Sequence, residues 1–100
     1  MRDDPADAVP DLWDLHFRDP AAAVARAEAL LAGGGADARA RAWADLTVAF
    51  QHLFFTAVPG EARAPLDRAQ QGFVALGDRR GEILARTGHA RLLLIEQQVE

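Results

Sequence analysis

A helix-forming pattern occurs twice in this chain, with the two copies beginning 40 residues apart at Ala22 and Ala62. In each copy, two alanines seven residues apart enclose a longer side chain, Arg26 or Leu66. A break and a second helix-forming stretch follow each copy. Self-similarity with a period of about 20–50 residues is typical of stacked helical hairpins, because a single hairpin cannot bury its apolar face alone. The sequence therefore predicts an all-α fold of two stacked antiparallel helical hairpins.

The composition favours helices and argues against several kinds of catalysis. Alanine, the strongest helix former, accounts for 22 of the 100 residues, whereas isoleucine and valine are few. The chain has no cysteine, serine or lysine. It therefore lacks the usual hydroxyl and thiol nucleophiles, the lysine of a Schiff base or P-loop, and any thiolate metal ligand. We expect no enzymatic activity, no catalytic residue and no cofactor.

The few polar residues that could form a site are scattered. His16, His52 and His89 fall on three different predicted helices, so we expect no metal site. Asp45 is predicted to lie on the solvated side of an amphipathic helix, as are Arg26 and Glu28.

The net charge of −4 is concentrated near the N-terminus. Residues 1–20 carry six aspartates and two arginines, whereas nine acidic residues balance nine arginines in residues 21–100. Nucleic acids and anionic membrane surfaces attract basic patches, so neither is an expected partner. Residues 1–10 hold three aspartates and two prolines without periodicity, which predicts a flexible acidic leader.

The N-terminus also lacks the apolar core of a secretory signal. No run approaches the ~20 apolar residues that a membrane-spanning helix needs. The expected location is therefore the cytoplasm.

Capping and stop signals delimit the first hairpin. Residues 11–17 predict a short lid helix, and Asp19 followed by Pro20 starts a helix that ends at glycines 33–35. A second helix is predicted from about Asp37 to Phe55. The predicted apolar positions are Ala23, Ala27, Leu30 and Leu31 in the first helix, and Trp43, Leu46, Thr47, Phe50, Leu53 and Phe54 in the second.

The second hairpin is predicted to follow from residue 61 onward. Its first helix spans about Glu61 to Leu76, with Pro65 in the first turn. Gly77 and Asp78 stop that helix and cap the next one, which runs from about Arg79 to the chain end. The predicted apolar stripe of the first of these helices is Ala62, Leu66, Ala69, Phe73 and Leu76.

The last helix contains four consecutive apolar residues, from Leu92 to Ile95. They point to all sides of a helix, so we expect a second copy of the chain or a further element to cover part of them. The helix also has no stop signal, which predicts that the chain is a fragment of a longer protein. The candidate interaction surface comprises Leu92, Leu93, Leu94, Ile95 and Phe55.

The hairpin pattern over about residues 20–98 resembles tetratricopeptide repeats. Ala62-x3-Leu66-x2-Ala69 matches the small-large-small spacing of that repeat's second helix, although Thr47 stands where a glycine is usual. The resemblance implies that residues 11–100 form a single tetratricopeptide-like domain with a concave groove. The candidate groove residues are Trp43, Thr47, Phe50, His52 and Arg86.

Four segments resemble the N-terminal helical-repeat region of bacterial diguanylate cyclases. They are Asp19-Pro-Ala-Ala-Ala, Ala27-Glu-Ala-Leu-Leu, Arg41-Ala-Trp-Ala-Asp-Leu and Leu76-Gly-Asp-Arg-Arg-Gly-Glu. The resemblance implies a non-catalytic sensor or dimerisation module of a bacterial signalling protein, which we expect to self-associate through its C-terminal helix. Two alternatives are a stand-alone adaptor that binds a peptide, and a small-molecule sensor with an apolar pocket between the second and fourth helices.

Overall fold

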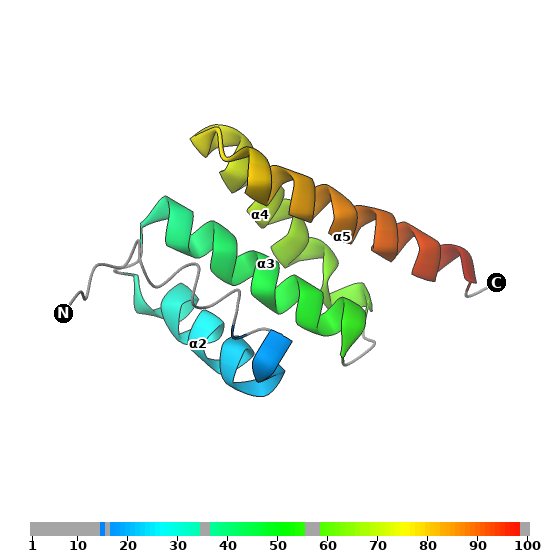
Figure 1. Cartoon of the computed structure of the whole chain (residues 1–100), viewed down its shortest axis with the longest axis horizontal. Helices are drawn as coiled ribbons and strands as arrows, with labels where there is room; N and C mark the ends of the chain where they lie inside the picture. Colours follow the sequence, from blue (N-terminus) through cyan, green and yellow to red (C-terminus); the bar gives the residue numbers. More distant parts are fainter. Residues whose placement is uncertain (1–14, 16, 35–36, 56–58, 99–100) are drawn as a thin grey trace.

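The computed structural model describes residues 15, 17–34, 37–55 and 59–98, and these ranges form four longer helices (Figure 1). The elements are α2 (Pro20–Gly33), α3 (Ala38–Phe54), the short 3₁₀ helix η1 (Pro59–Glu61), α4 (Arg63–Leu76) and α5 (Arg79–Gln98). Consecutive helices pack antiparallel, which confirms the predicted all-α class. The leader over residues 1–10 and most of the predicted lid helix lie outside the described residues. No described helix is long and apolar enough to span a membrane.

Helix α3 is the central element. It contacts α2 on one side and α4 and α5 on the other, whereas α2 contacts only α3 among the described helices (Figure 1). The burial pattern follows from this position, because 10 of the 17 residues of α3 are buried. In α2 only Ala23 and Ala27 are buried.

The first hairpin begins and ends its helices at the predicted signals. The Asp19 carboxylate accepts the backbone N–H of Ala22 at 3.2 Å, and Gly34 ends α2 in the left-handed conformation with φ 72°. The Asp37 carboxylate caps α3 by accepting the N–H of Ala40 at 2.8 Å. Each bond satisfies a backbone donor that the first turn of a helix leaves without a partner.

The turn between α4 and α5 is a Schellman motif. Gly77, with φ 71°, donates its N–H to the Val74 carbonyl at 3.1 Å, and Asp78 donates its N–H to the Phe73 carbonyl at 3.0 Å. The Asp78 carboxylate then accepts the N–H of Gly81 at 3.0 Å and so caps α5. One dipeptide therefore ends one helix and starts the next.

Helix α4 begins two residues later than predicted. Proline has no N–H, so Pro65 cannot bond to the carbonyl of Glu61, and the chain forms η1 there. The first α-helical bond of this region runs from the Leu66 N–H to the Ala62 carbonyl at 3.0 Å.

The main core lies between α3, α4 and α5. Phe73, Leu46 and Leu66 are its largest fully buried apolar side chains, and the edge of the Phe73 ring meets Trp43 with the ring centroids 5.1 Å apart. A separate small cluster joins α2 to α3, with Ala23, Ala27 and Ala44 at its centre and Leu15 packed beside them. Alanine buries little area, so the α2 contact contributes less apolar burial than the main core.

Two glycines allow α5 to pack closely against its neighbours. A Cβ atom at Gly81 would stand only 2.2 Å from the Phe73 ring, and one at Gly88 would stand 2.8 Å from Leu66 and 2.9 Å from Phe50. The main core therefore depends on the absence of side chains at these two positions.

Three predictions of burial were wrong. Asp45 is buried, because Arg68 of α4 pairs with its carboxylate. Phe54 is 45% exposed, since it lies in the last turn of α3 and packs only partly against Phe50. Leu76 is 44% exposed, because the chain turns away at Gly77 directly after it.

Candidate interaction surfaces

The apolar run in α5 divides between the inside and the outside of the domain. Leu92 is 2% exposed and belongs to the main core, and Ile95 packs against that core. Leu93 and Leu94 are 57% and 54% exposed. The four residues thus face more than one side of the helix, as the sequence indicated.

An apolar line continues from Leu94 along the outer side of α5. Its four members are Ile83, Thr87, Ala90 and Leu94, which we call the outer stripe, and all four are exposed. Their spacings of four, three and four residues place them within an arc of about 60° on a helix. The opposite side of α5 carries the buried residues Gly81, Ala85, Gly88 and Leu92. Helix α5 therefore carries apolar residues on its buried side and also on its outer side, which points away from the domain.

The polar groups on and beside the outer stripe have contacts within the chain. The Thr87 hydroxyl donates to the Ile83 carbonyl at 3.0 Å. Arg86 forms an ion pair with Glu82 at 2.8 Å. On the other flank, the Arg91 guanidinium lies 5.2 Å from the centroid of the Phe54 ring, a cation–π geometry. The arginines on the two flanks of the stripe thus already interact with other residues of their own chain.

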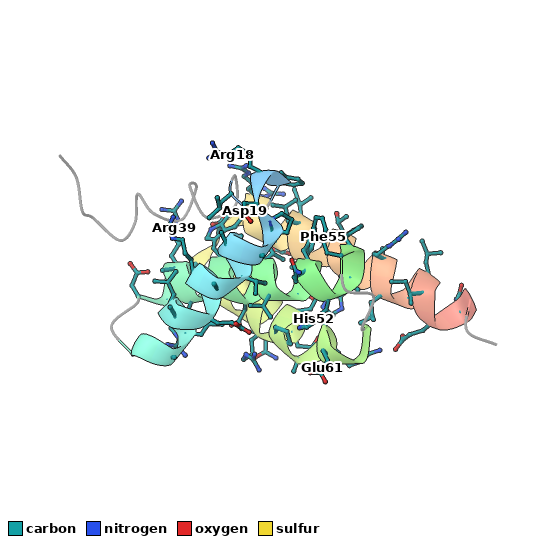
Figure 2. The ribbon with its side chains drawn as sticks, turned by 90° about the horizontal axis from the view of Figure 1, so that it is seen from below. Arg18, Asp19, Arg39, His52, Phe55 and Glu61 are labelled. Carbon is teal, nitrogen blue, oxygen red and sulfur yellow. The ribbon has the colours of Figure 1, made fainter. Side chains whose placement is uncertain are left out.

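A second apolar surface surrounds a pocket near the end of α3. The pocket has a volume of about 200 Å³ and is lined by Phe17, Phe50, Phe54 and Phe55. Figure 2 shows Phe55 at the end of α3, close to the start of α2 that Arg18 and Asp19 mark. Phe55 is 49% exposed, but it lies at this aromatic pocket rather than on the outer stripe.

The five candidate groove residues do not line one open groove. Trp43, Thr47 and Phe50 are buried, and the Thr47 hydroxyl donates to the Trp43 carbonyl at 2.9 Å. Helix α5 covers this side of α3, with Gly88 against Phe50 and the Arg80 guanidinium 5.8 Å above the Trp43 ring.

The other two groove candidates lie elsewhere. His52 is half-buried on a different side of α3 from Phe55 (Figure 2). Arg86 is exposed on α5. Three of the five candidates are thus buried, and a concave groove stays a prediction.

Asp45 and Arg68 form an ion pair between α3 and α4 that sequence reasoning missed. The Arg68 Nη2 and Nε atoms donate to Asp45 Oδ1 at 3.1 and 3.2 Å. Burial raises the pKa of the Asp45 carboxyl above its ordinary value of 3.8, and the nearby guanidinium groups of Arg68 and Arg41 oppose that rise. A raised carboxyl pKa can mark a catalytic acid. This carboxyl lies within a helix interface and not among the residues that line the aromatic pocket.

Among the described residues, the other titratable side chains show contacts between helices but no metal-binding cluster. Within the described ranges, no group of three or more histidine, aspartate or glutamate side chains is placed to hold a metal ion. His89 lies 3.4 Å from Asp67, so it links α5 to α4. His16 lies outside the described residues.

The comparisons with known proteins identify no relative. No protein-family model, curated protein or solved structure matches the chain. The described residues thus form a small all-helical domain with four longer helices, and no family is assigned to it.

Proposed function

We propose that this chain is a non-catalytic protein-interaction module that self-associates through the outer side of α5. The resemblance to the N-terminal region of bacterial diguanylate cyclases suggests a regulatory or dimerisation role in a signalling protein. The observation that best supports the proposal is the exposure of Ile83 and Leu94, at 62% and 54%, at the two ends of the outer stripe. An exposed apolar stripe of this kind is typical of interaction sites.

The energetics favour a modest association. Full burial of a leucine or isoleucine side chain contributes about 1.5–3 kcal/mol. The side chains of Ile83 and Leu94 are already partly covered, so each contributes less than that on association. The loss of translational and rotational freedom opposes binding. We therefore expect a reversible, concentration-dependent complex.

Replacing Leu94 by glutamate is expected to weaken self-association at least about tenfold, because a charge would enter an apolar interface. Sedimentation velocity over a range of protein concentrations measures this dissociation constant. Val74→Glu is the matched control, since Val74 is 55% exposed on α4, away from α5's outer side. The control should associate like the unmodified chain. Unchanged association of a folded Leu94→Glu variant would exclude this surface.

The aromatic pocket supports a second function, small-molecule sensing. Its volume of about 200 Å³ suits one aromatic ring, and Arg91 next to Phe54 offers a positive charge for a carboxylate. The sequence-based alternative placed a pocket between the second and fourth helices. The described lining comes instead from α3, its final turn and Phe17 ahead of α2, and Arg91 of α5 lies over the ring of the lining residue Phe54.

Under this second function, 3-phenylpropionate is expected to raise the melting temperature of the chain, because a ligand that binds only the folded state stabilises it. Its neutral amide should raise the melting temperature less. Arg91→Gln should remove the difference between the two compounds, whereas Arg26→Gln, on exposed α2 surface, should preserve it. Equal shifts with acid and amide in the unmodified chain would rule out recognition by Arg91.

A further inference from the structure

We infer that the second copy binds in one particular arrangement, an antiparallel α5–α5 pair related by a two-fold axis. In this pair, Ile83 packs against the partner's Leu94, and Thr87 lies beside the partner's Ala90. The inference rests on the proposed self-association and specifies its geometry.

The outer stripe is symmetric about its own centre. Read in either direction, its spacings are four, three and four residues, and its side chains run large, small, small and large. A two-fold axis through the centre brings Ile83 opposite the partner's Leu94 and Thr87 opposite the partner's Ala90. The stripe is therefore complementary to an antiparallel copy of itself, which is the condition for an isologous dimer.

The side chains of the stripe suit close packing of two helices. Thr87 and Ala90 at the centre are small, so the two helix axes can approach there, while Ile83 and Leu94 close the two ends. Burial of a hydroxyl is costly when it loses its hydrogen bond. The Thr87 hydroxyl already donates to the Ile83 carbonyl at 3.0 Å, so it can enter the interface without that cost.

The helix dipoles favour the antiparallel orientation over the parallel one. In a parallel pair the two positive helix ends lie side by side, whereas in the antiparallel pair each positive end lies beside a negative end. The arginines beside the stripe do not distinguish the two orientations. The parallel pair places Arg86 at the level of the partner's Arg86, and the antiparallel pair places it at the level of the partner's Arg91.

The length of the stripe sets the strength of the pair. From Ile83 to Leu94 it covers 11 residue steps, or only about 16 Å along the helix. Such a contact falls below the ~800 Å² per partner of a standard stable interface. We therefore expect a weak dimer that forms at high protein concentration.

Cysteine cross-linking tests the arrangement, because the native chain has no cysteine. The variants Ile83→Cys and Leu94→Cys are prepared separately and treated with a short bifunctional maleimide, alone and as a mixture. The antiparallel pair brings the two substituted positions together only in a mixed dimer. In dimers of one variant, they stand about 16 Å apart along the helix. Intact mass spectrometry should show several-fold more cross-linked dimer in the mixture than in either variant alone.

A mixture of Ile83→Cys with Leu93→Cys is the matched control, because Leu93 is equally exposed but lies off the stripe. It should cross-link less than the first mixture. Efficient cross-linking of either variant alone would overturn the inference in favour of a parallel pair. If sedimentation shows association and the first mixture does not exceed the control, the register is wrong and self-association stands. If sedimentation of the unmodified chain shows no association at all, the proposed function fails together with the register.

Discussion

Replacing Gly81 by alanine is expected to lower the free energy of unfolding by about 2 kcal/mol, although alanine is the better helix former. The new Cβ atom would stand 2.2–2.5 Å from three atoms of the Phe73 ring. That ring cannot easily move, because it is fully buried and its edge meets Trp43. Overpacking of this kind costs up to about 3 kcal/mol. The higher helix propensity of alanine offsets about 1 kcal/mol of this cost.

Urea denaturation followed by circular dichroism measures this loss. Gly33→Ala is the matched control, since no atom lies within 4 Å of its added Cβ. The control should be neutral or slightly stabilising. The double variant Gly81→Ala/Phe73→Leu should lose less stability than the sum of the two single variants, because the smaller side chain removes the clash. A Gly81→Ala chain as stable as the unmodified one would contradict the close packing of α5 on α4.

Replacing Arg68 by alanine is expected to lower the free energy of unfolding by about 1–2 kcal/mol at neutral pH. Hydrogen bonds to a charged group contribute about 1.5–3 kcal/mol. The solvent screens this pair because the Arg68 side chain is 60% exposed, so the lower part of that range applies. The Asp45 side chain is only 7% exposed and would keep its charge without a bonded partner.

The effect should depend on pH in a defined direction. Because the pKa of Asp45 is raised in the folded state, its burial lowers stability as pH rises from 3.8 through the folded-state pKa. Loss of Arg68 would raise that pKa further. The stability difference between the Arg68→Ala variant and the unmodified chain should therefore grow as pH rises through the folded-state pKa and become small well below pH 3.8, where Asp45 is protonated in both. Urea denaturation at several pH values measures it.

Arg86→Ala is the control for this pH series. Arg86 pairs with Glu82 on the surface, and its side chain is 68% exposed. Such pairs within one helix contribute about 0.3–0.5 kcal/mol. If Arg68→Ala costs no more than Arg86→Ala at neutral pH, the Asp45–Arg68 pair does not stabilise the α3–α4 interface.

The helix boundaries were predictable because their causes are local. Asp19 caps a residue three positions away, and the Gly77–Asp78 turn satisfies carbonyls at Phe73 and Val74. Each of these bonds spans at most five residues, so the relevant chemistry can be read directly from the sequence. The late start of α4 has a local cause as well, since Pro65 removes one N–H donor.

The outer stripe shows where prediction from local sequence patterns fails. The spacing of Ile83, Thr87, Ala90 and Leu94 is visible in the sequence, but α5 has apolar residues on two sides. Periodicity alone cannot say which side faces the core. Gly81 and Gly88 let Phe73, Leu66 and Phe50 approach one side, and this leaves the outer stripe exposed.

The sequence by itself determined the helical class, the antiparallel order of the helices and most helix ends, because these follow from propensities and from bonds between near neighbours. Only the tertiary structure decided that Asp45 is buried, since its partner Arg68 lies 23 residues away. It also decided that Trp43 and Phe50 are buried beside α5. These outcomes depend on contacts between distant segments, and no local pattern encodes which side chains will meet there.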